Sequence, residues 1–134
     1  MSADWQGDVL SFCIRFRVPF HSKPTVPRDR RSVAGMMGTR KNRKKLLREE
    51  TRELSKAIDE GDLSHVAKET ADVIFVALGI ATTYGISMQP VWDLVQESNM
   101  AKQGGGLRPD GKILKPEGWQ APDIQAEIDR QSRS

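Results

Sequence analysis

The sequence has little cysteine, few aromatic residues and no long hydrophobic run. One cysteine, Cys13, stands among 134 residues, which excludes a disulfide framework or a cysteine-based zinc site within one chain. Such cysteine usage is typical of a reducing compartment, so we expect a cytoplasmic protein. The longest apolar stretch, residues 73–81, is too short for a membrane span, which takes ~20 residues. We also expect no signal peptide and no membrane partner, because residues 1–8 lack a basic stretch followed by an apolar run.

Charge is plentiful by comparison, and its basic part is unevenly distributed. Charged residues make up 29% of the chain, and the net charge is +3. Basic clusters of this kind serve nucleic acid, a phosphate-bearing small molecule or simply a solvated face, and all three interpretations stay open. No aromatic residue is interleaved with the charges, so a stacking platform for single strands is not expected there. The two clusters are Arg28, Arg30 and Arg31, and then Arg40, Lys41, Arg43, Lys44, Lys45 and Arg48.

The hydrophobic pattern predicts an all-α protein with one domain over residues 1–134. Helices are expected over residues 4–17, 40–60, 63–84 and 87–102, which makes a four-helix bundle with a core of about 4–102. Prolines 19, 24 and 27 interrupt the pattern, so residues 19–38 are expected to form a functional or mobile loop. The tail, residues 103–134, is expected to be irregular or to form a short hairpin around Asp110-Gly111, with a last helical turn or two from Asp123 and a frayed end from about Gln131. The long apolar faces also predict a homodimer or homotetramer.

Acidic residues lie on the apolar face of the second expected helix. Glu50 follows Leu46 by four residues, and Glu53 precedes Ala57 by four. Both carboxylates therefore fall on or beside the inward face, and Glu49 borders the same side. The alternative is a surface helix stabilised by ion pairs, because basic residues alternate with these acids.

The third expected helix carries two acids in an almost continuous apolar setting. We expect this helix to be largely buried, yet Glu69 and Asp72 lie three residues apart on one of its faces. A buried carboxylate without a partner is costly, and the adjacent Lys68 is expected to point elsewhere. A connection of about two residues makes the second and third helices antiparallel, which would bring the acids of both into one cleft. Clustered carboxylates of this kind suit a hard divalent cation, and Mg²⁺ is the common one.

The acids and the downstream residues together resemble a known family. The pattern is similar to the signature of the MazG-like all-α nucleoside triphosphate pyrophosphohydrolases, which include dUTPase-like and phosphoribosyl-ATP pyrophosphohydrolase-like members. The similarity covers roughly residues 9 to 128, and Ala121 departs from it where the family tail has proline. The segments that carry it are Glu49-Glu50-x-x-Glu53 followed after 15 residues by Glu69-x-x-Asp72, Ser98-Asn99-Met100-Ala101-Lys102, the Asp110-Gly111-Lys112-Ile113-Leu114-Lys115 run, Trp119, Pro122-Asp123-Ile124, and residues 23–27.

The resemblance implies hydrolysis of a nucleoside triphosphate to the monophosphate and pyrophosphate. It also implies Mg²⁺ as cofactor, with Mn²⁺ as a substitute. The metal ligands are then Glu50, Glu53, Glu69 and Asp72, and Glu49 is the candidate catalytic base, or else a further ligand. Phosphate or sugar would be held by Asn99 and Lys102 near the end of the fourth helix, and by Lys112 and Lys115 from the tail.

Two other functions remain open. One is a phosphoribosyl-ATP pyrophosphohydrolase of histidine biosynthesis, an enzyme of the same build. The other is a basic helical module that binds nucleic acid through residues 28–48, which would leave Glu69 and Asp72 without a role. We therefore do not expect a nucleic-acid partner, and family resemblance favours a deoxynucleotide, with a purine such as dGTP as the example.

Overall fold

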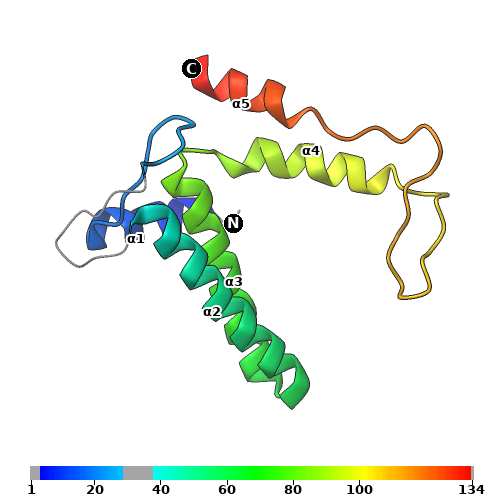
Figure 1. The fold of residues 1–134 in the computed structure, drawn as a ribbon, viewed down its shortest axis with the longest axis horizontal. Coiled ribbons are helices and arrows are strands. Elements are labelled where there is room, and N and C mark those ends of the chain that lie inside the picture. The colour runs from blue at the N-terminus through cyan, green and yellow to red at the C-terminus, as the bar shows by residue number, and fades with distance from the viewer. Residues whose placement is uncertain (1–3, 29–37, 134) are drawn as a thin grey trace. The chain divides into compact units, whose positions relative to one another are not determined.

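The computed structural model describes residues 4–28 and 38–133. Over these residues the chain is all-helical, with five helices and no strand. The all-α prediction is therefore confirmed, although the C-terminal segment forms a ten-residue helix rather than the expected turn or two. The helices are α1 (Trp5–Phe16), α2 (Thr39–Glu60), α3 (Leu63–Thr83), α4 (Met88–Met100) and α5 (Ile124–Arg133) (Figure 1).

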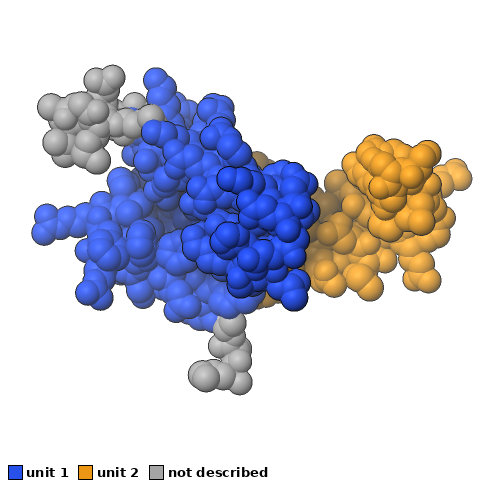
Figure 2. Space-filling view, turned by 90° about the horizontal axis from the view of Figure 1, so that it is seen from below, with its two compact units in different colours: residues 1–86 blue, residues 87–134 orange. Residues whose placement is uncertain are grey.

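The chain divides into two compact units, which are coloured separately in Figure 2. The first unit, residues 1–86, holds α1, α2 and α3, and the second, residues 87–134, holds α4 and α5. One domain over residues 1–134 stays a prediction, because compact units of this kind can belong to a single folding domain. Among the described residues, no helix taken singly has the length and apolar character needed to cross a membrane.

A two-residue connection makes α2 and α3 an antiparallel pair. Gly61 ends α2 in the left-handed conformation, with φ of 72°, and its N–H donates to the carbonyl of Ala57. Asp62 then caps α3, because its side chain accepts hydrogen bonds from the backbone N–H groups of Ser64 and His65. The two long helices run side by side from this turn (Figure 1), so residues at similar distances from it face one another.

The small core of the first unit forms where α1 packs against α3. Val9 and Cys13, four residues apart on α1, are both buried. Beside them the ring of Phe12 meets Phe75 of α3 edge to face, with 5.2 Å between the ring centroids. Asp4 begins α1 by accepting a hydrogen bond from the N–H of Gly7, as expected of a helix N-cap.

The first part of the loop after α1 is held against the end of α3. His21 Nδ1 lies 2.7 Å from the carbonyl oxygen of Thr83, and the Thr83 hydroxyl donates to the carbonyl of Pro19. The N–H of Thr25 donates to the carbonyl of Tyr84. The described residues of this predicted functional or mobile loop are therefore anchored, while residues 29–37, with Arg30 and Arg31, lie outside the described part.

The expectation that α3 is largely buried is wrong for the single chain. Its buried residues are Gly79, Ala81, Thr82 and Thr83, all near its C-terminal end. Phe75, one of its large apolar side chains, is 38% exposed. The physical reason is that α1 and α2 pack against only part of the surface of α3, so apolar positions on the rest of that surface stay uncovered.

The tail of the second unit makes a turn without a regular hairpin. Leu107 and Ile113 form an isolated antiparallel bridge, and the N–H of Arg108 donates to the carbonyl of Lys112. Gly111 occupies the turn with φ of 90°, a conformation that glycine adopts without strain. The Asp-Gly turn was predicted correctly, but its pairing extends no further than this bridge.

The end of the chain is better anchored than its sequence indicates. We expected fraying from about Gln131, but its side chain is buried. Gln131 accepts a hydrogen bond from the N–H of Ser87 and donates one to the carbonyl of the same residue. These two bonds join α5 to the start of α4, and fraying at Gln131 is therefore wrong.

Candidate active site

Three acidic side chains meet between α2 and α3. Glu50 of α2 and Glu69 and Asp72 of α3 each place one carboxylate oxygen within 4.8 Å of the other two. All three residues are partly buried. We call Glu50, Glu69 and Asp72 the acid triad, and it forms because antiparallel pairing about Gly61 brings the middle of α2 opposite the first half of α3.

Two oxygens of the acid triad are buried without a hydrogen-bond partner. They are Oε2 of Glu50 and Oε2 of Glu69, the only such side-chain atoms among the described residues. Burial raises the pKa of Glu50, and the charges of Asp72, Glu53 and Glu69 raise it further. Desolvated carboxylate oxygens that repel one another are the donor set that a hard divalent cation prefers, so the triad fits a metal ion of this class.

A lysine partly neutralises the acid triad, contrary to our expectation that it would point elsewhere. Lys68 Nζ lies 2.6 Å from Oδ2 of Asp72 and 3.7 Å from Oε1 of Glu69. The hydrogen bond and charge of Asp72 raise the pKa of Lys68, with a further contribution from Glu69. Lys68 and Asp72 are four residues apart on one helix face, a spacing that could have revealed the pair in the sequence.

The two other predicted acids of α2 lie outside the acid triad. Glu53 is exposed, yet it is close enough for its charge to raise the pKa of Glu50. Glu49 has a side chain that is 45% exposed and lies 4.0 Å from Lys45 Nζ. The roles of Glu53 as a ligand and of Glu49 as a base or ligand therefore stay predictions.

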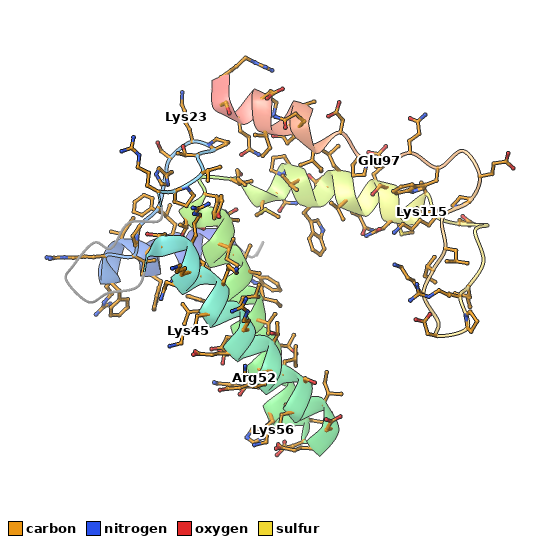
Figure 3. All side chains as sticks on the ribbon, in the orientation of Figure 1. Lys23, Lys45, Arg52, Lys56, Glu97 and Lys115 are labelled. Atoms are coloured by element: carbon orange, nitrogen blue, oxygen red, sulfur yellow. The ribbon has the colours of Figure 1, made fainter. Side chains whose placement is uncertain are left out.

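Two predicted phosphate-binding lysines of the second unit share one aromatic ring. Lys102 Nζ lies 5.5 Å and Lys115 Nζ 4.6 Å from the ring centroid of Trp119. The indole N–H of Trp119 donates to the carbonyl of Ser98 at 2.8 Å, which fixes the ring near the end of α4. Figure 3 labels Lys115 in this segment.

The remaining two residues of that predicted set are less constrained. Asn99 is exposed on the last turn of α4, and its backbone carbonyl accepts from the N–H of Lys102. Lys112 is exposed in the turn, where its backbone N–H donates to the carboxylate of Asp110. Their substrate contacts stay predictions.

The basic residues of the second cluster extend along the first half of α2. Four of them, Arg40, Lys41, Arg43 and Lys44, line a pocket of about 410 Å³ together with Leu47, Ile80 and Tyr84. Burial lowers the pKa of Arg43, whose guanidinium donates to the side chain of Asn42. Basic side chains continue toward the turn, as Lys45, Arg52 and Lys56 show in Figure 3.

Comparison with protein families identifies the chain. The model of the phosphoribosyl-ATP pyrophosphohydrolase family matches residues 16–99, which is more than half of the sequence and includes the whole acid triad. The chain belongs to this family. Its members are MazG-like all-α pyrophosphohydrolases, so this protein is a hydrolase that acts on phosphoanhydride bonds. The family generally depends on a divalent metal ion, in agreement with the fit of the acid triad. No curated protein gives a significant match to the sequence.

The family match ends before most of the predicted phosphate-binding residues. Asn99 is its last matched position, and Lys102, Lys112, Lys115 and Trp119 lie beyond it. From the sequence, Trp119 was used only as part of the family-like tail, and the contact of its ring with two lysines was missed. The proximity of Trp119 to Lys102 depends on the path of the tail, for which the sequence holds no direct signal.

Proposed function

We propose that this chain hydrolyses a nucleoside triphosphate, with a deoxynucleotide as the favoured substrate, to the monophosphate and pyrophosphate. The observation that carries the proposal is the pair of buried, unpartnered oxygens within the acid triad. A protein that folds around two desolvated acids gains from a bound cation, and a triphosphate requires such a cation for hydrolysis. The same geometry has no use in a module that only binds nucleic acid through its basic residues.

The proposed cation is Mg²⁺, with Mn²⁺ as a substitute, held by Glu50, Glu69 and Asp72. Such a cation supplies charge neutralisation for the triphosphate and orientation of the attacking water. The chain itself contributes positioned carboxylates, and Glu53 lies beside them as a further proposed ligand. Glu49 stays our candidate for holding the water proton, and Lys102 and Lys115 our candidates for binding phosphate oxygens.

The test is a panel of nucleoside triphosphates with Mg²⁺ or Mn²⁺, in which release of pyrophosphate is measured. Wild type should turn over at least one deoxynucleotide, and Glu69→Gln should lower kcat/KM at least about a hundredfold, the upper range for loss of groups that support a metal site. Asp59→Asn is the matched control, because Asp59 is an exposed acid of α2 outside the triad. Full activity of Glu69→Gln with an intact helical spectrum would contradict the proposal.

Phosphoribosyl-ATP is the second candidate substrate, and the description of the matched family favours it. The same assay with phosphoribosyl-ATP in the panel separates the two substrates. Turnover of phosphoribosyl-ATP without turnover of any simple triphosphate would assign the chain to the histidine pathway. A salt-dependent shift of DNA without turnover of either substrate would instead favour nucleic-acid binding.

We also propose that the chain works as a homodimer or homotetramer. Large apolar side chains are exposed at the turn between α2 and α3, where Leu63 is 87% exposed, and on α4, where Trp92 is 63% exposed. A second copy of the chain could bury these side chains, because each copy exposes the same apolar residues and the two surfaces can pack against each other. Light scattering should give a mass of at least two chains, and a monomer at micromolar concentration would contradict this.

A further inference from the structure

The pocket at the start of α2 is lined mostly by cations, and we call it the basic pocket. Four of its lining residues are Arg40, Lys41, Arg43 and Lys44, and none of the other three is acidic. Its volume of about 410 Å³ falls within the ~300–1,000 Å³ that is typical of small-molecule sites. A hollow of this size encloses a small ligand, whereas a basic face that is merely solvated needs no hollow.

Arg43 reaches from α2 to α3 and is partly buried there. A Cβ added to Gly79 of α3 would lie only 3.1 Å from Nη1 of Arg43, so the guanidinium rests where α3 has no side chain. Burial lowers the pKa of Arg43, which means that its surroundings disfavour the positive charge. A solvated basic face would leave this charge in water, and the basic pocket therefore differs from such a face.

The charge of Arg43 has no anionic partner among the described residues. Neither Arg43 nor Lys44 forms an ion pair there. Both hydrogen bonds of Arg43 go to one neutral oxygen, Oδ1 of Asn42, at 2.8 and 3.3 Å. Nη1 of Arg43 makes no hydrogen bond with a described residue, and yet it is not fully buried. It is therefore open to a ligand in the basic pocket.

The start of α2 adds to the unbalanced positive charge. Its first turn contains no acid, and its N-cap, Gly38, provides no side-chain hydrogen bond. The N-terminal end of a helix carries a partial positive charge, so basic residues there are unfavourable and an anion is favourable. Arg40 and Lys44 also lie four residues apart on one helix face, where like charges repel. A bound anion would relieve both effects.

The cations of the basic pocket occupy two levels of the helix. Arg43 and Lys44 follow Arg40 and Lys41 by three residues, which is ~4.5 Å along the axis at a rise of ~1.5 Å per residue. Arginine binds phosphate oxygens through paired N–H groups, and lysine binds them as a point charge. Two levels of such cations suit two linked phosphate groups better than a single one.

We propose that the basic pocket binds two or more linked phosphate groups, as in pyrophosphate or the phosphate chain of a nucleotide. The site is separate from the acid triad, since Arg43 precedes Glu50 by seven residues, or ~10 Å along α2. Because its lining contains no acid, the basic pocket holds its ligand without a metal ion. The source of the phosphate groups is either free pyrophosphate or the substrate itself, and turnover distinguishes the two.

Calorimetric titration of the metal-free protein with inorganic pyrophosphate is the test. Without a divalent ion the acid triad repels the anion, so the heat reports on the basic side chains. Wild type should bind pyrophosphate at least about tenfold more tightly than inorganic phosphate, because phosphate engages only one level of cations. Arg43→Gln should weaken pyrophosphate binding about ten- to a hundredfold, as expected for the loss of a charge-assisted hydrogen bond.

Two substitutions that remove the same charge elsewhere serve as controls. Lys45→Gln alters a neighbouring cation of α2 that does not line the basic pocket (Figure 3), and Lys115→Gln alters a cation of the second unit. Each should weaken binding less than about fivefold, the effect of one screened surface charge. Lys44→Gln, at an exposed residue, guards against misfolding of Arg43→Gln and should weaken binding more than either control.

Three results would overturn the inference. One is an equal affinity for pyrophosphate in wild type and in both variants of the basic pocket. Another is a loss of binding that is confined to Lys115→Gln, which would place the anion in the second unit. The third is a wild-type protein that binds a short DNA duplex through Arg43 and Lys44 but does not bind pyrophosphate, because the basic residues would then form a nucleic-acid surface.

Turnover by Arg43→Gln distinguishes the two sources of the phosphate groups. If the basic pocket holds the phosphate chain of the substrate, KM for the triphosphate should rise by the same factor as the pyrophosphate affinity falls, with kcat near wild type. If the pocket holds free pyrophosphate, KM should stay unchanged while pyrophosphate binding is lost. The binding measurement needs no hydrolysis, so failure of the proposed function and failure of this inference are separate results.

Discussion

At the scale of single residues, the carboxylates of the acid triad repel one another, and one lysine partly offsets this repulsion. Glu50 and Glu69 each hold a buried oxygen without a partner, while Lys68 hydrogen-bonds the third acid, Asp72. Lys68 thus supplies to Asp72 part of the positive charge that a bound cation would supply. The metal-free protein keeps its acids together at a cost that Lys68 reduces, and a divalent ion would remove that cost more completely.

Replacement of Lys68 should therefore change the stability of the metal-free protein and that of the metal-bound protein in different ways. Lys68→Met should lower the thermal midpoint of the metal-free protein, because the repulsion among the acids is no longer offset. It should also increase the rise in midpoint caused by Mg²⁺, because no lysine competes for Asp72. Thermal unfolding with and without the metal measures both effects. Lys56→Met, at an exposed lysine of the same hairpin, is the control, and equal midpoints for the two variants would count against this account.

Trp119 also bears on charged side chains, because its ring contacts the ammonium groups of two lysines that would otherwise repel each other. Trp119→Leu should release Lys102 and Lys115, and KM should rise about two- to fivefold for each cation–π contact, worth ~0.5–1 kcal/mol at an exposed site. NMR provides an independent signature, since ring-current shifts of both lysine side chains should disappear. Trp119→Phe loses the indole N–H but retains a ring, so it should keep part of the shift. Unchanged lysine resonances in Trp119→Leu would refute the contact.

At the scale of elements, the α2–α3 hairpin determines where the acids meet. Its turn has two residues, of which Gly61 supplies a positive φ and Asp62 supplies the cap. A shift of this turn by one residue would rotate α3 by about 100° relative to α2, since an α-helix has 3.6 residues per turn. Glu69 would then leave Glu50. The cap at Asp62 is thus a stabilising element of the site, although it lies seven residues, about two helical turns, before Glu69.

The cap also predicts a dependence of stability on pH. The hydrogen bond from the Ser64 hydroxyl lowers the pKa of Asp62 most, and the N–H groups of His65 and Ser64 lower it further. A lowered pKa means that the stabilisation is present above the unfolded-state pKa and is lost as pH falls through the folded-state value. Asp62→Ala should therefore melt below wild type at pH 7, and the gap should narrow below about pH 4.

The variant Asp62→Asn distinguishes the stabilisation that comes from the cap hydrogen bonds from the stabilisation that comes from the carboxylate charge. Asparagine keeps an acceptor for the N–H groups of α3 but does not titrate, so it should stay close to wild type at pH 7. On acidification its midpoint should fall less than that of wild type. The measurement is thermal unfolding between pH 7 and pH 3, and an Asp62→Ala midpoint equal to wild type at pH 7 would rule out the cap as a source of stability.

At the scale of the whole molecule, the two units differ in how much they bury. The first unit buries four hydrophobic residues, Val9, Cys13, Ala57 and Ala81. Among the described residues of the second unit, Gln131 is the only one that is buried, and it is polar. The second unit is thus held mainly by hydrogen bonds and local turns, and a second copy of the chain would provide apolar cover that it lacks.

Hydrogen exchange should reveal this difference. In the monomeric state, amides of α4 and α5 should exchange faster than those of the α2–α3 hairpin, because few apolar contacts oppose local opening. Gln131→Ala should speed exchange in α4 and α5 further, since loss of a buried hydrogen-bonding partner costs about 1–3 kcal/mol. Protection that rises with protein concentration would indicate cover by a second copy, whereas equal protection of both units at all concentrations would contradict the difference.

The sequence by itself determined the local features of this protein. Helix spacing, the cap at Asp62, the stop at Gly61 and the family motif are all local, because each depends on residues within one or two helical turns. From them follow the all-α fold, the antiparallel hairpin and the set of acids that we propose as metal ligands. The same information predicted five converging acids, since carboxylates at helical spacing are equivalent until two helices are placed against each other.

Only the tertiary structure decided which of those acids meet. The rotation of α2 against α3 brings Glu50 to Glu69 and Asp72 and leaves Glu49 beside Lys45, a choice that depends on packing across the whole hairpin. Long side chains add a second uncertainty, because rotamers direct Lys68 toward Asp72 although the apolar pattern indicated otherwise. The basic pocket was also beyond the sequence, since Arg40 and Tyr84, which are far apart along the chain, both line it and their proximity depends on the pairing of α2 with α3.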